Sequence, residues 1–358
     1  MRDVWPLLSH LTRIFILTML ILAGTISMTL IFWPQYFRGR SSDYTIYSYQ
    51  KIQMSRQTGM NNVVIGDSRG NCHFDPRRFG ESWLNLSLPG STPMEGFVTL
   101  EKYLNAGNKA DTLVIVYGID HLRSRNLGFF ENLAIPHRLM DPYQLKELED
   151  FENQNGAMFQ RGDHISAMGL GYRQLARRLK YMRFPLAYHS NFSRGVRDMT
   201  VDRERTDGRS ESLKKSLPST RGFMLFGIDS SYDKPMRIRP GSQYDLNPFS
   251  RHYLGRIFEL SRRHGTKVFL IVPPLNEATF AYPHAVAFLN QAHLHLENLT
   301  SSYPHVRLVT RPAALPNDCF GDDNWHFNKR GVNLYSRTLW NEVFMREGSP
   351  VVPPDPPL

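Results

Sequence analysis

The sequence is poor in cysteine: its 358 residues include only Cys72 and Cys319. No cluster of Cys and His has the spacing of a metal site, which excludes the zinc-finger and zinc-ribbon classes, and two cysteines are too few for a disulfide framework. The sequence also lacks a nucleic-acid-binding motif and an internal repeat. We therefore expect no metal, no cofactor and no nucleic-acid partner.

The chain has an excess of positive charge, with a formal net charge of +10 at pH 7. Without a nucleic-acid motif, such a surface favours anionic lipid headgroups or an acidic polysaccharide. The alternative is a basic face that is simply solvated. The charge by itself does not choose between these possibilities.

The N-terminal part has no charged residue from Ile14 to Phe37, and residues 14–33 are strongly apolar. About twenty helical residues span the hydrocarbon core of a bilayer. Trp33 and Tyr36 stand where interfacial aromatic residues are expected. A cleavable signal peptide is the alternative, but the apolar run is long and no clear Ala-x-Ala site follows it. The sequence favours a transmembrane anchor within residues 1–40.

Charge does not fix the orientation of this anchor. Arg2 and Arg13 precede the apolar run, and Arg38 and Arg40 follow it, so the balance is nearly even. One large body follows the lone anchor. We therefore expect a single-pass protein of the inner membrane with a periplasmic, or otherwise extracytoplasmic, body.

The remaining chain divides by composition. A polar linker is expected at 41–60, a main body at 61–348 and a Pro-rich tail at 349–358, which cannot form a helix or a central strand. Within the body, the regular alternation of apolar and amphipathic stretches disappears at about 122–247. We interpret these residues as a long insertion.

In the rest of the body, short apolar runs alternate with amphipathic stretches. The runs expected to be strands are 62–65, 83–88, 112–117, 267–272 and 306–310, and the expected helices are 93–105, 249–263, 284–299 and 328–344. Such alternation predicts a mostly parallel five-stranded sheet with helices on both faces, a three-layer α/β/α sandwich.

Polar residues and a glycine follow the predicted strands. In chain order they are Ser68, Gly90, Asp120, Asn276, Asp323 and His326. Because the carboxyl ends of parallel strands lie at one edge of the sheet, we expect these residues to meet there. Substrate contacts at this edge are expected from Arg69, His121 and Asn276.

Three of these residues have the chemistry of an acyl-transfer site. The hydroxyl of Ser68 is a poor nucleophile unless a base takes its proton, and His326 can be that base. Asp323, three residues earlier, can orient the imidazole. The backbone N–H groups of Ser68 and Gly90 are candidate donors to the oxyanion.

The same residues resemble the conserved blocks of the SGNH, or GDSL-like, hydrolase superfamily. The matching residues are Gly66-Asp67-Ser68, Gly90 and Asp323-x-x-His326. The resemblance implies a three-layer α/β/α fold with a Ser-His-Asp site. It also implies an oxyanion hole made by Ser and Gly backbone donors and an Asn side chain.

The third block departs from this pattern. Where the family has Gly-x-Asn-Asp, the chain reads Gly118-Ile119-Asp120-His121, so Asp120 stands at the place of the Asn donor. An ionised carboxylate cannot donate a hydrogen bond and repels an oxyanion. Three alternatives are open: Asp120 is protonated, another donor such as His121 serves, or Asp120 binds something else.

The two cysteines flank the two halves of the expected site. Cys72 follows Ser68 by four residues, and Cys319 precedes Asp323 by four. If the halves meet, the cysteines can meet too and form a disulfide in an oxidising compartment. The alternative is a pair of buried thiols.

The anchor and the altered third block are similar to extracytoplasmic SGNH proteins that modify polymers. Examples are the alginate O-acetyltransferases, the D-alanine transfer protein of teichoic acid synthesis and accessory proteins of bacterial cellulose loci. The resemblance implies O-acyl (acetyl) transfer to, or removal from, an envelope or exported polysaccharide. The expected partner is a membrane-bound acyltransferase or polymer synthase.

Two other functions fit the same residues. A catalytically weak scaffold that binds a glycan or a synthase partner is consistent with Asp120. A lipid esterase at the membrane surface is consistent with the anchor and the triad.

Overall fold

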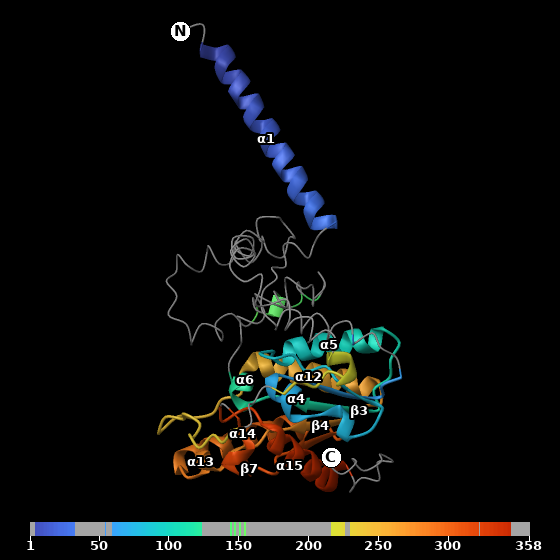
Figure 1. The fold of residues 1–358 in the computed structure, drawn as a ribbon, viewed down its shortest axis with the longest axis vertical. Helices are drawn as coiled ribbons and strands as arrows, with labels where there is room; N and C mark the ends of the chain where they lie inside the picture. The colour runs from blue at the N-terminus through green and yellow to red at the C-terminus, as the bar shows by residue number, and fades with distance from the viewer. Residues whose placement is uncertain are drawn as a thin grey trace. The chain divides into compact units, whose positions relative to one another are not determined.

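The computed structural model describes residues 4–32, 54, 59–123, 216–225, 230–321 and 323–344, and single residues at 144, 147, 150, 151 and 154. The chain divides into two units. The first unit contains the N-terminal helix α1, and the second contains the sheet and its helices. The two units are described separately below, with the elements labelled as in Figure 1.

The first unit contains helix α1, which runs from Val4 to Phe32. Its side chains at 9–25 are exposed. Within the described part of the chain, no helix is both long and apolar enough to cross a membrane. The membrane anchor expected within residues 1–40 stays a prediction from the sequence.

The second unit is built on a five-stranded sheet in which every strand pair is parallel, in the order β2-β1-β3-β4-β6. The strands are β1 (Asn62–Gly66), β2 (Trp83–Asn85), β3 (Thr112–Val116), β4 (Lys267–Ile271) and β6 (Val306–Val309). The predicted α/β class and the predicted five-stranded parallel sheet are confirmed.

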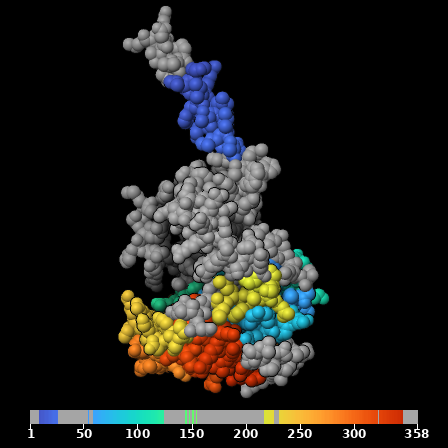
Figure 2. All heavy atoms as spheres, viewed as in Figure 1, coloured from blue at the N-terminus to red at the C-terminus, as the bar shows by residue number. Residues whose placement is uncertain are grey.

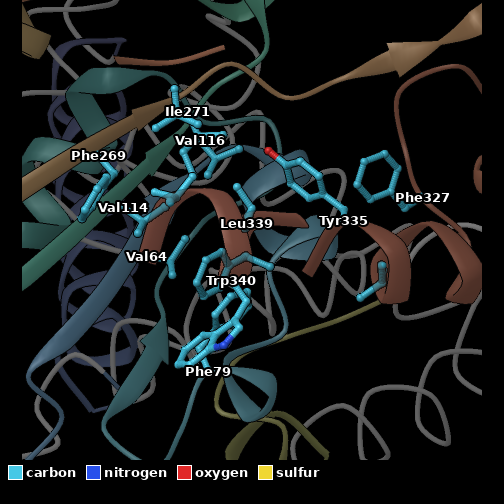
Figure 3. Packing of buried hydrophobic residues seen from close by; sticks show 14 of the residues in the cluster. Val64, Phe79, Val114, Val116, Phe269, Ile271, Phe327, Tyr335, Leu339 and Trp340 are labelled. Carbon is cyan, nitrogen blue, oxygen red and sulfur yellow. The ribbon is translucent and has the colours of Figure 1, made fainter. Parts of the chain in front are cut away.

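The strands are continuous apolar runs because helices cover both faces of the sheet. On one face, Val64, Val114 and Phe269 lie in one row across three strands and belong to the main apolar cluster. Leu339 and Trp340 complete this cluster from α15 (Lys329–Leu339) and the helical turn that follows it. Figure 3 shows these strand and helix side chains packed together.

Helices α5 (Pro93–Asn105), α12 (Pro248–Arg263) and α14 (Pro283–Thr300) belong to the other side. A Cβ on Gly96 of α5 would lie 3.5 Å from Ile65, whose side chain points away from the Val64 face. Phe258 of α12 packs against Tyr303, just after α14, with ring centres 5.1 Å apart. Figure 1 shows α5 and α12 on one side of the sheet and α15 on the other.

The predicted helix bounds agree closely with the structure, but the second strand is shorter than predicted. The expected strand at 83–88 ends at Asn85, whose side-chain oxygen accepts a hydrogen bond from the Ser87 N–H at 3.0 Å and whose amide donates to the Gly70 carbonyl at 2.8 Å. Beyond Asn85 the Leu86 N–H still donates to the Val64 carbonyl at 2.7 Å, but the regular strand does not continue. A small sheet of β5 (Leu275–Asn276) and β7 (Ala314–Leu315) was not predicted.

Part of the predicted insertion belongs to this second unit. The Asn85 N–H donates to the Arg221 carbonyl at 2.9 Å, and the Arg221 guanidinium donates to the Gly80 carbonyl. Figure 2 shows the yellow residues of 216–225 beside the cyan residues that lead to β2. Farther along, the Tyr232 N–H donates to the Asn317 carbonyl at 3.2 Å. The described stretches 216–225 and 230–247 therefore both contact the α/β body.

Candidate active site

The fold brings Ser68, His326 and Asp323 into hydrogen-bonding contact. Ser68 is the first residue of α4 (Ser68–His73) and follows β1 by one residue, and the other two lie in the loop before α15. The Ser68 Oγ is 2.8 Å from Nε2 of His326, and Nδ1 of the same ring is 2.6 Å from Oδ2 of Asp323. All three residues predicted for catalysis thus form one chain of hydrogen bonds.

Asp323 is held so that it faces the imidazole. Its Oδ1 accepts hydrogen bonds from the Trp325 N–H at 2.8 Å and the His326 N–H at 2.7 Å. Burial raises the pKa of the Asp323 carboxyl, but the hydrogen bonds and charge of His326 outweigh this, and the net pKa is below its ordinary value. An ionised Asp323 accepts the Nδ1 proton, which leaves Nε2 to receive the proton of Ser68.

The residue before Ser68 anchors the nucleophile loop. The buried Asp67 accepts from the Arg69 N–H at 2.8 Å and from the Gly118 N–H at 2.9 Å. Gly66, at the end of β1, is required by close packing, since a Cβ there would lie 2.0 Å from the Val116 carbonyl oxygen. The loops after β1 and β3 are therefore bonded directly to each other.

The predicted backbone donors lie on adjoining segments. The Ser68 N–H is at the N-terminus of α4, where amides have no acceptor within the helix. Gly90 has a φ of 78°, a left-handed conformation that favours glycine. The Gly66 carbonyl accepts from the Leu88 N–H and the Ser91 hydroxyl, both at 2.8 Å. These bonds hold the turn that contains Gly90 beside the end of β1.

Asp120 forms an ion pair in this site. Its Oδ1 lies 2.6 Å from Nη1 of Arg69. Burial raises the pKa of the Asp120 carboxyl, but the Arg69 guanidinium outweighs it and lowers the net pKa below the ordinary value. An ionised carboxylate has no proton to donate. Of the three alternatives for Asp120, the structure favours binding to another group, and that group is Arg69.

The three residues predicted to contact substrate have different surroundings. The Asn276 side chain is fully buried and donates to the carbonyls of Tyr232 at 3.1 Å and Lys234 at 2.9 Å. The prediction for Asn276 is wrong, because its amide secures a neighbouring segment and has no surface for a ligand. Arg69 is also buried, with a side chain 5% exposed. His121 is partly exposed, and its Nδ1 lies 3.1 Å from the Ser91 carbonyl.

Sequence reasoning assigned no role to Asp67, His73 or Trp325. The Nε2 of the buried His73 is 2.8 Å from the Trp325 carbonyl, and its ring stacks on Phe327 with centres 3.6 Å apart. Burial lowers the pKa of His73 well below its ordinary value, so the ring is neutral and donates to that carbonyl. In the sequence, Asp67 directly precedes Ser68, and Trp325 lies between Asp323 and His326. This proximity to the catalytic residues is the signal that could have identified them.

The predicted disulfide is not formed. Cys72 and Cys319 are both buried free thiols. The sulfur of Cys319 points toward the Asp318 carboxylate at 3.8 Å, and that of Cys72 interacts with the backbone of Phe327. Desolvation raises the pKa of Cys319 to about 11 and that of Cys72 well above its ordinary value. Both thiols are therefore protonated and unreactive at neutral pH.

Among the residues that the structure describes, no group of three or more His, Cys, Asp or Glu side chains is arranged to hold a metal ion. The chemistry available at this edge of the sheet is that of a serine, an imidazole and a carboxylate. No protein-family model matches the chain, and no curated protein matches it.

Proposed function

We propose that the protein is an acyl-transfer enzyme of the SGNH type that forms an acyl ester on Ser68. The observation that carries this proposal is the continuous hydrogen-bond chain from Ser68 through His326 to Asp323, with distances of 2.8 and 2.6 Å. The residues come from loops far apart in sequence, and their order of contact is the one that general-base activation of a serine requires.

In the first half of the reaction, the Ser68 Oγ attacks the carbonyl carbon of an ester-linked acyl group, and its proton passes to Nε2 of His326. The oxygen that becomes negative is stabilised by the backbone N–H groups of Ser68 and Gly90. As the tetrahedral intermediate collapses, His326 returns the proton to the leaving alcohol. The acyl group then remains on Ser68 as an ester.

In the second half, an acceptor hydroxyl attacks the acyl-serine. His326 takes the acceptor's proton and then returns it to the Ser68 Oγ as the acyl-serine bond breaks. With water as acceptor the enzyme is an esterase, and with a sugar hydroxyl it is an O-acyltransferase. The two activities share the acyl-enzyme and differ only in the acceptor.

The substrate class that we propose is an acylated polysaccharide of the envelope or an exported polymer. The support is the resemblance to extracytoplasmic SGNH proteins and the net charge of +10, which suits an anionic polymer. In this proposal the acyl group is acetyl and comes from a membrane-bound acyltransferase or polymer synthase. Attachment to the inner membrane and a periplasmic body remain predictions from the sequence.

A chromogenic acetate ester tests the proposed chemistry. We expect turnover that depends on Ser68, with the Ser68→Ala variant reduced to the background rate. Addition of a soluble oligosaccharide acceptor then separates transfer from hydrolysis, because transfer yields an O-acetylated sugar that mass spectrometry detects. Turnover by Ser68→Ala at the wild-type rate would rule out the assignment of the nucleophile.

A second candidate function is a weakly catalytic scaffold that binds a glycan or a synthase partner. The observation that favours it is Asp120, which replaces a side-chain donor with an ionised acceptor. A scaffold predicts no Ser68-dependent turnover of the acetate ester but retains binding to a polysaccharide. The same assay with wild-type protein therefore separates the two candidates.

A further inference from the structure

Arg69 connects three segments around the nucleophile. Its Nη1 donates to Oδ2 of Asp67 at 3.1 Å and forms an ion pair with Oδ1 of Asp120, 2.6 Å away. Its guanidinium carbon lies 4.4 Å from the ring centre of Trp325, within the range of a cation–π contact. One buried side chain thus links the start of α4, the short helix α6 (Ile119–Arg123) that follows β3, and the loop that carries Asp323 and His326.

Gly118 makes room for this arrangement. A Cβ at this position would lie 0.9 Å from Nη1 of Arg69 and 2.5 Å from Oδ1 of Asp120. Any side chain at 118 would therefore displace the guanidinium. Gly118 also donates its backbone N–H to Oδ2 of Asp67 at 2.9 Å. Gly118 therefore also holds in place the second carboxylate that pairs with Arg69.

Trp325 is the contact through which Arg69 reaches the catalytic loop. Its backbone N–H donates to Oδ1 of Asp323 at 2.8 Å, and its carbonyl accepts from Nε2 of His73 at 2.8 Å. Trp325 lies between Asp323 and His326 in the sequence. A shift of its indole therefore moves the backbone that orients both the base and its carboxylate.

We propose that Asp120 and Arg69 are positioning residues for the loop that carries Asp323 and His326. Asp120 fixes the guanidinium of Arg69, and Arg69 fixes the indole of Trp325. The catalytic consequence rests on the proposed function. At position 120 the family resemblance implies an asparagine that donates to the oxyanion. Asp120 instead holds Arg69 and donates nothing to the oxyanion. The donors to the oxyanion are the backbone N–H groups of Ser68 and Gly90.

The substitution Asp120→Asn separates these two roles by the sign of its effect. If position 120 should donate to the oxyanion, an asparagine restores the amide donor and raises kcat. If Asp120 holds Arg69, the asparagine removes the negative charge that faces the guanidinium and loosens Trp325. A displacement of catalytic groups by about 1 Å can lower a rate by about 100-fold.

The experiment compares Asp120→Asn with wild-type protein on an activated acetyl ester. We expect kcat to fall by about 10- to 100-fold, with KM changed by less than about threefold, because alignment is lost while ester binding is kept. Trp325→Ala should show a similar loss, and Trp325→Phe should recover most of it, because phenylalanine keeps an aromatic face for Arg69. A kcat for Asp120→Asn equal to or above that of wild-type protein overturns the proposal.

The matched control is Asp318→Asn, which breaks the exposed ion pair of Asp318 with Arg330 at 2.7 Å before the same catalytic loop. We expect kcat to change by less than about twofold, as is typical for exposed pairs. Unfolding midpoints of all variants show whether a loss of activity reflects unfolding.

Hydrogen exchange gives a readout that does not depend on activity. Asp120→Asn should raise the amide exchange of residues 323–327, and Asp318→Asn should leave it unchanged. If Ser68 of the wild-type protein is not acylated, the proposed function fails, and hydrogen exchange alone then decides the positioning role. Unchanged exchange at 323–327 in Asp120→Asn overturns the proposal in either case.

Discussion

Two aspartates near Ser68, Asp323 and Asp67, differ in their exposure to solvent and in the groups that they face. The side chain of Asp323 is 32% exposed and faces the imidazole of His326, whereas that of Asp67 is 0% exposed and faces a guanidinium, two backbone N–H groups and, at 3.2 Å, Nδ1 of His121. The imidazole that faces Asp323 also contacts the Ser68 hydroxyl, whereas the imidazole that faces Asp67 contacts a backbone carbonyl instead. The comparison teaches that partial exposure and a partner in contact with the nucleophile suit a carboxylate to catalysis, while burial among several donors suits it to holding a loop.

The largest expected effect separates these two aspartates. Asp323→Asn should lower kcat by about 10⁴-fold, because the amide no longer selects the tautomer in which Nε2 accepts the proton of Ser68. Its unfolding midpoint should fall by less than that of Asp67→Asn, since the amide oxygen still accepts the backbone N–H groups of Trp325 and His326. Steady-state kinetics and urea unfolding on the same preparation measure both quantities.

The matched change Asp67→Asn should mainly affect stability. Removing the charge leaves the buried Arg69 with an incomplete set of partners, which costs about 3–5 kcal/mol of the free energy of unfolding. Urea unfolding measures this cost. If Asp67→Asn unfolds like wild-type protein, or if Asp323→Asn keeps its activity, the division of roles between the two aspartates is wrong.

Acidification tests whether the carboxyls of Asp120 and Asp323 are ionised in the folded protein. The pKa of Asp120 and that of Asp323 are both lowered in the folded protein. A carboxyl with a lowered pKa stabilises the fold fully above its unfolded pKa of about 3.9, and this contribution is lost as the pH falls through its folded pKa. The melting temperature of wild-type protein should therefore fall between pH 5 and pH 3. Asp120→Asn should show a smaller fall over the same range, and an equal or larger one would contradict the ionised Asp120.

The smallest expected effect concerns the two cysteines, which lie four residues from Ser68 and from Asp323 in the sequence. Because Cys72 and Cys319 are free thiols, a reducing agent should leave the melting temperature and the activity unchanged. Thermal unfolding with and without dithiothreitol measures this. A lower melting temperature in the reducing agent would indicate a disulfide between the two halves of the site.

The sequence predicts the sheet and the triad because both rest on short-range patterns. Apolar runs such as 112–116 identify strands covered on both faces, and parallel strands bring Ser68 and His326 to the same edge. The predicted helix at 93–105 has the observed bounds, since Thr92 and Glu95 form a capping box at its start. These features depend on neighbouring residues along the chain.

Contacts between side chains from distant segments could not be predicted in this way. The pairing of Arg69 with Asp120 depends on the space that Gly118 leaves, and the loss of Asn276 as a ligand depends on the segment at 232–234 packing over it. The described residues at 216–225 and 230–247 were assigned to an insertion because they lack periodicity. They join the body through scattered backbone and side-chain hydrogen bonds, which leave no periodic signal.

Mass spectrometry of the peptide that contains Ser68, after exposure of the whole protein to an activated acetyl donor, tests the central claim most directly. The account predicts one acetyl group on Ser68 in wild-type protein, little or none in Asp323→Asn and none in Ser68→Ala. Wild-type protein in which Ser68 stays unmodified, or acetylation that persists at the same level in Ser68→Ala, would contradict it.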